Sequence, residues 1–253
     1  MARKYGSASL CKRPLLKLSG EMFGGSSGFG FDRTSLDTYV EEITELIRNG
    51  ITPSIVLGGG NFFRGARTQL PALRRHRADA IGMLATLMNS ICFAEHLLHQ
   101  GIPTEVFSAI QIDSVCSFYQ IDRARATLDG GSVCIFACGT GAPFFSTDSA
   151  AALRAVELGC GVLIKATKVD GVYDCDPMKN PKAKKFESIT YSEVIERDLQ
   201  VMDLVAISLC RENEMPLIVL SMAESGSILR ACQGKHIGTR VIADRKNQDR
   251  RRN

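Results

Sequence analysis

The chain has 253 residues, of which 45% are hydrophobic and 23% charged, a composition typical of a globular protein with a sizeable core. No apolar run approaches the roughly 20 residues of a membrane-spanning helix, and the N-terminus lacks the apolar segment of a secretory signal, so we expect a cytoplasmic protein. Residues 1–13 and 245–253 each contribute a net +4 to the overall +4, which leaves −4 for residues 14–244. We therefore expect a single domain, 14–244, between two basic tails, 1–13 and 245–253.

The nine cysteines are odd in number, include no CxxC pair and lie mostly in apolar runs. Reduced thiols pack there as small hydrophobes, so we expect neither disulfides nor a structural zinc site. His96 and His99 have metal-like spacing but no third ligand, which favours a solvated helix face.

The first predicted strand, 14–18, contains Lys17 and leads directly into Ser19, Gly20 and Glu21. A lysine in a core strand needs a partner for its ammonium group, and a phosphate is a natural one, although an edge strand could turn it to water. Residues 24–30, GGSSGFG, are too rich in glycine for regular structure. They predict a loop that could be a lid, an effector loop or a connector.

Apolar residues at helical spacing predict a helix from Leu36 to Ile47, followed by a strand at 51–57. This strand opens into GGGNFFRG, residues 58–65. Three glycines let backbone amides approach a phosphate, and Arg64 can clamp it, although a triple glycine also forms simple tight turns. We favour the phosphate site.

The next predicted helix, 78–98, has Gly82 for close packing and an apolar stripe that we expect to be buried, formed by Ile81, Leu84, Leu87, Met88 and Ile91. Asp79 lies in its first turn. Its charge suits the helix dipole there, or it accepts hydrogen bonds from a substrate hydroxyl.

A strand at 104–108, a helix at 122–128 and a strand at 133–137 precede GTGAPFFSTDSAA, residues 139–151. This segment enters a helix whose N-cap we expect at Ser146 or Thr147. It places a flexible backbone, hydroxyl groups and a helix N-terminus at the carboxyl edge of a sheet, where open α/β sheets bind ligands. We therefore expect an anionic ligand there.

The strand at 162–166 contains a second embedded lysine, Lys165, and continues into KATKVDGVYDCDP, residues 165–177. This polar loop with one aromatic side chain suits a nucleobase and ribose, although Tyr173 could also be a core residue. A capping box at 190–193, helices at 203–212 and 228–232, and strands at 217–220 and 237–242 complete the chain. The alternation of strands and helices predicts a three-layer αβα sandwich around a mostly parallel central sheet.

The usual nucleotide loops, GxxxxGK[ST] and a GxGxxG between strand and helix, are missing. What remains is two glycine loops, two strand-end lysines, an arginine and a polar aromatic loop. Two anionic ligands that face each other with lysines between them describe phosphoryl transfer.

The motifs KLSGE (17–21), GGGNFFRG (58–65), GTGAPFFSTDSAA (139–151) and KATKVDGVYDCDP (165–177), with the Asp79 helix, resemble the amino acid kinase family and most of all its bacterial uridylate kinase branch. The resemblance runs from about residue 14 to 242. It implies a UMP kinase, which transfers the γ-phosphoryl group of ATP to UMP in pyrimidine nucleotide biosynthesis. It also implies Mg²⁺ carried by ATP, with no confident metal ligand among the protein side chains.

The same resemblance implies roles for individual residues. The catalytic group would be Lys17, Lys165 and Asp148, with Asp148 orienting the lysines. ATP would contact Lys17, Leu18, Ser19, Gly20, Gly60, Arg64, Thr167, Tyr173 and Asp176. UMP would contact Gly59, Asp79, Thr140, Gly141, Ala142, Pro143, Phe144, Phe145, Ser146 and Thr147. An effector loop would comprise Gly25, Ser26, Ser27, Gly28, Phe29 and Gly30.

Many family members are homohexamers that GTP activates and UTP inhibits, so the resemblance implies a homohexamer with possible UTP feedback. Residues 88–107 contain no Lys or Arg, where activated members place basic residues, and we expect weak or absent activation by GTP.

Three other readings remain open. They are another amino acid kinase, a non-catalytic nucleotide-binding storage or regulatory protein on the same fold, and a nucleic-acid binder that uses the basic ends. Retention of both lysines and Asp148 argues against lost catalysis. Neither tail alternates arginine with aromatic residues, so we expect no specific binding of nucleic acid, and no membrane binding.

Overall fold

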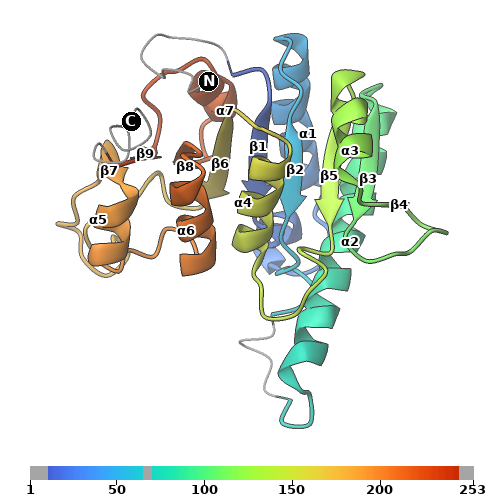
Figure 1. Cartoon of the computed structure of the whole chain (residues 1–253), viewed down its shortest axis with the longest axis horizontal. Helices are drawn as coiled ribbons and strands as arrows, with labels where there is room; N and C mark the ends of the chain where they lie inside the picture. Colours follow the sequence, from blue (N-terminus) through green and yellow to red (C-terminus); the bar gives the residue numbers. More distant parts are fainter. Residues whose placement is uncertain (1–10, 65–69, 245–253) are drawn as a thin grey trace, which may run out of the picture.

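A nine-stranded sheet forms the centre of the protein in a computed structural model that describes residues 11–64 and 70–244 (Figure 1). The strand order is β4-β3-β5-β2-β1-β6-β8-β9-β7, and all pairings are parallel except that of β8 with β9. The strands are β1 Pro14–Leu18, β2 Ser54–Leu57, β3 Thr104–Ser108, β4 Ser117–Phe118, β5 Val133–Ala137, β6 Val162–Thr167, β7 Ser188–Thr190, β8 Leu217–Ser221 and β9 Thr239–Ile242.

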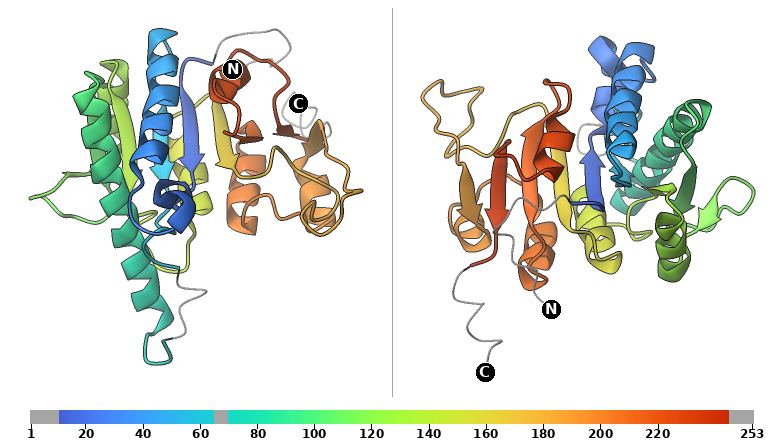
Figure 2. Two further views of the ribbon diagram at one scale, coloured as in Figure 1. Left: turned by 180° about the vertical axis from the view of Figure 1, so that it is seen from behind. Right: turned by 90° about the horizontal axis from the view of Figure 1, so that it is seen from above.

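Helices cover both faces of this sheet (Figure 2). They are α1 Arg33–Arg48, α2 Arg75–His99, α3 Ile121–Asp129, α4 Thr147–Glu157, α5 Tyr191–Glu196, α6 Leu204–Glu212 and α7 Ser227–Cys232, with a 3₁₀ helix, η1 Gly20–Ser27. Core residues of α1, α2 and α7 pack on one face and those of α3, α4, α5 and α6 on the other. The expected three-layer αβα sandwich is thereby confirmed.

The two faces follow from the alternation of side chains along each strand. In β1, Leu16 and Leu18 belong to the core under α1, α2 and α7, whereas Leu15 belongs to the core under α3 to α6. Lys17 therefore points to the same face as Leu15. Lys165 shares that face with Leu163 of β6.

Several element predictions need correction. Residues 24–27 are not loop but belong to η1, which ends in a left-handed Gly28. The strand predicted at 51–57 is formed only by Ser54–Leu57, and α2 begins three residues before the expected start at residue 78. Two very short strands, β4 and β7, were not predicted because two or three residues carry no periodicity.

The prediction that the apolar stripe of α2 is buried was largely wrong. Ile81, Leu84 and Met88 are 39%, 47% and 46% exposed, while Phe93 and Leu97 of the same helix lie in the core. Nothing lies within 4 Å of the position of a Cβ on Gly82, so its missing side chain makes no room for a neighbour among the described residues, although the Gly82 carbonyl oxygen lies close to Gly59. The helix is apolar on nearly every side, so its periodicity could not select the face that packs on the sheet. Although α2 has the length and apolar composition of a membrane-spanning helix, its residues Phe93, Ala94 and Leu97 pack in the core against the sheet.

Candidate active site

Two lysines lie side by side near the carboxyl ends of the central strands. Lys17 of β1 and Lys165 of β6 are register partners in adjacent parallel strands. Asp148, in the first turn of α4, contacts both: its Oδ1 lies 2.9 Å from Lys17 Nζ and its Oδ2 lies 2.7 Å from Lys165 Nζ. Two like charges in register repel each other, so the carboxylate between them is what allows this arrangement.

Burial alone would raise the pKa of the Asp148 carboxyl, but the charges of Lys17 and Lys165 outweigh it and hold the pKa below the usual value. Burial lowers the pKa of the Lys165 ammonium, and Asp148 offsets part of that effect. Lys165 also donates a 2.6 Å hydrogen bond to the carbonyl of Val201. The cluster thus presents two partly exposed ammonium groups, and its carboxylate is a poor base at neutral pH.

The local sequence of α4 fixes Asp148. Ser146 is the N-cap, as expected, and its hydroxyl accepts hydrogen bonds from the backbone N–H groups of Asp148 at 2.9 Å and Ser149 at 3.2 Å. Asp203, the N-cap of α6, accepts hydrogen bonds from the hydroxyls of Ser146 and of Ser149, the latter at 2.9 Å. From the sequence, Asp203 could be identified only as the start of a helix. Its contact with Ser149, which lies 54 residues earlier in the chain, leaves no local sequence pattern.

The KLSGE turn and the GGGN turn contact each other beside the lysines. A Cβ on Gly20 would lie 2.2 Å from the carbonyl oxygen of Gly58, so only glycine fits. Gly59 packs against α2, where a Cβ would lie 2.8 Å from Ala85 Cβ. Buried Asn61 and Asn89 tie this junction together, since Asn89 donates to the Gly58 carbonyl at 2.6 Å and to Asn61 Oδ1 at 2.8 Å. The asparagine pair was not predicted.

Arg64 lies at the mouth of this junction. Its guanidinium pairs with Glu21 and donates from Nε to the carbonyl of Gly60 at 3.4 Å. Lys168, from the loop after β6, lies 3.9 Å from the other oxygen of Glu21. KLSGE, GGGN and the segment after Lys165 therefore converge at one edge of the sheet. Gly65, at the end of the GGGNFFRG motif, lies outside the described residues.

The connection between β5 and α4, residues 138–146, has an unusual backbone. Cys138, Gly139, Gly141 and Phe144 all have positive φ, with 71° for Phe144. The backbone N–H of Phe144 donates to Asp79 Oδ2 at 2.9 Å, so the connection is held against the first turns of α2 (Figure 1). Thr140 bonds only within the turn, to Ala142. Ala142, Phe144, Phe145 and Ser146 are exposed, and Pro143 and Thr147 are half-buried.

The loop after β6 is held by an ion pair. Asp170 contacts Lys185 at 2.7 Å and accepts a 2.6 Å hydrogen bond from the hydroxyl of Tyr173. Tyr173 is thus not a core residue. Thr167 caps the start of the loop by accepting from the N–H of Val169, and Asp176 is exposed.

The candidate effector segment lies next to the glycine junction. The N–H of Gly30 donates to the carbonyl of Asn61 at 3.2 Å. Phe29 and Phe31 contact the Phe62 ring edge-on, at centroid distances of 5.8 and 5.1 Å. The segment is thus in direct contact with the GGGN turn.

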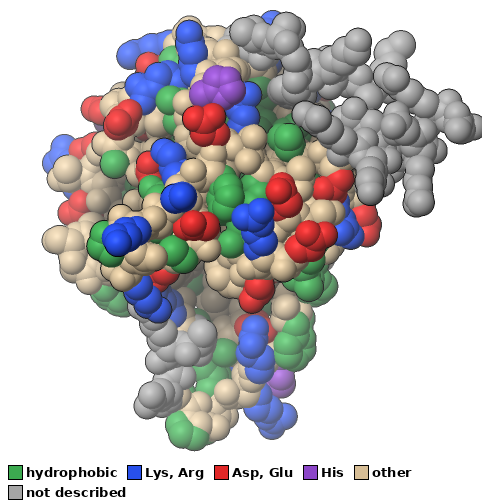
Figure 3. Space-filling model, turned by 90° about the vertical axis from the view of Figure 1, so that its left-hand side faces the viewer, with side chains coloured by type: hydrophobic (Ala, Val, Ile, Leu, Met, Phe, Trp, Pro, Cys, Tyr) green, Lys and Arg blue, Asp and Glu red, His purple; other side chains and the backbone are tan. Residues whose placement is uncertain are grey.

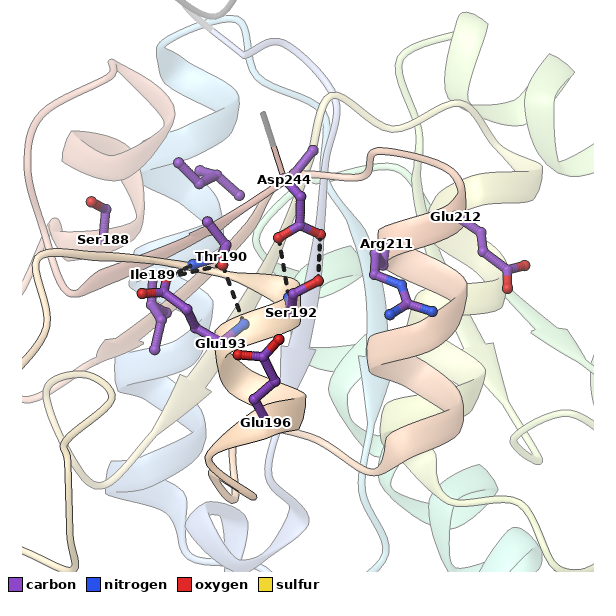
Figure 4. Close-up of a pocket in the computed structure, with 11 residues that line it drawn as sticks. Ser188, Ile189, Thr190, Ser192, Glu193, Glu196, Arg211, Glu212 and Asp244 are labelled. Atoms are coloured by element: carbon purple, nitrogen blue, oxygen red, sulfur yellow. Dashed lines mark hydrogen bonds between the residues drawn. The ribbon is translucent and has the colours of Figure 1, made fainter. Parts of the chain in front are cut away.

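A separate cavity of about 880 Å³ opens between α5, α6, β7 and β9 (Figure 4). Its carboxylates come from Glu193, Glu196, Glu212 and Asp244. Because β7 and β9 run antiparallel to β8, their carboxyl ends lie at the edge of the sheet away from Lys17 and Lys165. None of the predicted site residues lines this cavity. On the face shown in Figure 3, basic and acidic side chains of the described residues are interspersed.

The site and fold define a class of protein. A model of the amino acid kinase family matches residues 12–221, and the chain belongs to that family. Among its relatives, the uridylate kinase of Pseudomonas paraeruginosa is 49% identical over 230 residues, which cover 91% of this chain and 94% of that protein. The uridylate kinase of Haemophilus influenzae is 45% identical over 235 residues, which cover 93% and 99%.

Solved structures agree. The UMP kinase from Bacillus anthracis superimposes with a TM-score of 0.90 at 35% identity and covers 93% of this chain and 98% of its own. The UMP kinase from Ureaplasma parvum superimposes with a TM-score of 0.86 at 33% identity and covers 92% and 100%.

Proposed function

We propose that the chain is a UMP kinase, a nucleoside monophosphate kinase that catalyses ATP + UMP → ADP + UDP. The observation that carries this proposal is the pair of register-matched lysines held by Asp148 beside the KLSGE and GGGN turns, in a chain 45–49% identical to uridylate kinases over most of its length. The chemistry needs fixed positive charge between two phosphate groups.

In this mechanism Lys17 and Lys165 stabilise the transferring phosphoryl group. In a loose, metaphosphate-like transition state the charge lies on the equatorial oxygens, and fixed cations there lower the barrier without a general base. Asp148 is ion-paired, with a pKa below its usual value, so it orients the lysines and takes no proton.

The ligands would occupy the two sides of the lysine pair. ATP phosphates would lie over Ser19, Gly20 and Gly60, with Arg64 at the mouth and the adenosine along Thr167, Tyr173 and Asp176. UMP would lie against Gly59, Asp79 and residues 140–147. The N–H groups of Gly141 and Phe144, both at positive φ, already donate to the Cys138 carbonyl and to Asp79 Oδ2, so this connection is held in shape before a ligand binds.

Mg²⁺ would enter with ATP, bound by phosphate oxygens and water. In the described part of the chain, no group of three or more His, Cys, Asp or Glu side chains could hold a metal ion. Mg²⁺ is usually held through substrate phosphates, with one or two carboxylates and several waters.

The test is a coupled ADP-release assay with Mg-ATP and separate wells of UMP, CMP, dUMP, TMP, AMP and acetylglutamate. We expect turnover largely confined to UMP. Turnover of acetylglutamate would instead favour another amino acid kinase. Binding of ATP with silence in every well would favour a storage or regulatory protein.

We also propose that the protein is a cytoplasmic homohexamer of pyrimidine biosynthesis with UTP feedback and weak or absent activation by GTP. The exposed apolar side chains Ile81, Leu84 and Met88, beside the open surface over Gly82, support contact with a second copy. Sedimentation of the full chain, and rates measured with added UTP or GTP, test these points. A several-fold increase in rate with GTP would overturn the proposal that GTP activation is weak or absent.

A further inference from the structure

Arg75 occupies a position where electrostatics alone disfavours it. It is the first residue of α2, it follows Arg74, and it precedes His76 and Arg77, all of them exposed. The first turn of α2 contains no acidic residue and its N-cap makes no side-chain hydrogen bond. Since the N-terminus of a helix carries partial positive charge, a cation there is unfavourable. Helix electrostatics therefore does not explain an arginine at position 75.

Contacts of Arg75 join α2 to the β5–α4 connection. Arg75 Nε donates to Asp79 Oδ1 at 2.9 Å and to Oδ2 at 3.1 Å. Its Cζ lies 5.9 Å from the centre of the Phe144 ring. Asp79 Oδ2 accepts from the backbone N–H of Phe144 at 2.9 Å. Arg75, Asp79 and Phe144 thus form a closed triangle of contacts.

Neither the Arg75–Asp79 pair nor the turn at Phe144 adds much to the free energy of unfolding. Arg75 is 69% exposed, and an exposed pair four residues apart on a helix contributes little, the more so with the cation on the N-terminal side. Phe144 has a φ of 71°, which a residue with a bulky side chain rarely adopts. Strain held by a weak surface pair points to a functional turn.

We propose that Arg75 is a positioning residue for the acceptor side of the site. It fixes the Asp79 carboxylate, and the carboxylate in turn holds the strained turn at Phe144. This proposal rests on the proposed function, in which Asp79 and residues 140–147 contact UMP. A carboxylate offers about four lone-pair positions. Arg75 and Phe144 use three of them, so the oriented Asp79 keeps capacity for a ribose hydroxyl.

The test compares Arg75→Ala with Arg75→Lys and with Arg77→Ala, which removes one positive charge from the same turn at an exposed position. For Arg75→Ala we expect KM for UMP to rise about tenfold, since a charge-assisted contact is lost, with KM for ATP and kcat changed less than about twofold. The kcat/KM ratio of UMP to dUMP should also fall, because Asp79 is no longer oriented toward the ribose. Arg75→Lys should recover part of both losses, and Arg77→Ala should match the parent chain.

A second measurement does not depend on turnover. In the ligand-free full chain, Arg75→Ala should exchange the amide hydrogens of residues 140–147 several-fold faster, while Arg77→Ala should not. An unchanged exchange rate, or equal changes in KM for both substrates with a lower Tm, would overturn the positioning role. Absence of UMP turnover in the parent chain would instead count against the proposed function, and the exchange experiment would still decide the contact.

Discussion

At the scale of single residues, the site is built on the charges of Lys17, Lys165 and Asp148. The sequence points to these residues but not to their arrangement. Lys17 and Lys165 could be predicted because a lysine inside an apolar strand is costly and therefore conspicuous. Their alignment in register could not, since it depends on which strands become neighbours. Asp203 and Asn89 contribute through contacts that span 54 and 28 residues and have no local sequence signal.

Lys17→Ala should lower kcat on the order of 10²–10³-fold, because one of the two fixed cations at the transferring phosphoryl group is lost. UMP binding should change little, because Lys17 forms its ion pair with Asp148, which lies outside the proposed UMP contacts at Asp79 and residues 140–147. Steady-state kinetics and a UMP titration measure the two effects. Lys12→Ala, at an exposed position just before β1, is the charge control. Equal losses in turnover and binding would assign Lys17 a structural role.

The buried position of Lys165 predicts that kcat/KM depends on pH. Burial lowers the pKa of its ammonium below the ordinary value of 10.5, so the group loses its proton, and the site a cation, at a lower pH than a surface lysine would. We expect kcat/KM to fall on the alkaline side before pH 10.5. Arginine stays charged there, so Lys165→Arg should move that fall to higher pH even if its maximum rate is lower. Superimposable alkaline profiles would assign the fall to another group.

At the scale of elements, the sequence was informative about which segments are strands and helices but less so about their faces. Boundaries of β3 and β5 were predicted to the residue. Strand β5, VCIFA, is a short buried apolar run, whereas β3, TEVFS, is a mixed segment with only two apolar side chains. The exposed face of α2 was mistaken for its buried one, since a helix that is apolar all round gives no orientation. The 3₁₀ helix η1 was mistaken for a loop because it is rich in glycine, a weak helix former, and Gly25 interrupts it with a non-helical φ of 54°.

The contact between η1 and the GGGN turn can be tested by Gly20→Ala. An added methyl group would meet the Gly58 carbonyl oxygen at 2.2 Å, and a backbone atom cannot rotate away. We expect a loss of about 1–3 kcal/mol in the free energy of unfolding, with reduced affinity for ATP. Gly50→Ala is the control: Gly50 has a φ of 71° with nothing within 4 Å, so only backbone strain of about 1–2 kcal/mol applies. Denaturant titration gives both stability costs and an ATP titration gives both affinities. A Gly20→Ala chain that binds ATP as tightly as the Gly50→Ala chain would contradict the steric conflict beside the site.

At the scale of the whole molecule, Glu42 links the first helix to the last. It is only 4% exposed, and it accepts a 2.6 Å hydrogen bond from the N–H of Gly226, 184 residues further along the chain. Burial raises the pKa of its carboxyl, and hydrogen bonds from Gly226 and Ser225 reduce that effect without reversing it.

A carboxyl with a raised pKa in the folded state contributes stability that is present below the ordinary pKa of 4.5 and is lost as pH rises through the folded value. Glu42→Gln keeps an oxygen acceptor and removes the titration. We expect the Tm of the variant relative to the parent chain to increase between pH 4.5 and pH 8. The exposed neighbour Glu41→Gln should show no such trend. A Tm difference that is constant with pH would contradict the linkage.

The strand order also has a consequence for the way the protein is made. All strands up to β5 lie on one side of β1, and β6 to β9 lie on the other, so Lys17 and Lys165 meet where the two halves of the chain join. While the ribosome synthesises the first half, the open edge of β1 has no strand to pair with until residues 162–167 emerge. The nascent chain therefore carries a central, apolar strand edge through more than half of its synthesis, and this edge is where pairing with a neighbouring nascent chain is most favoured.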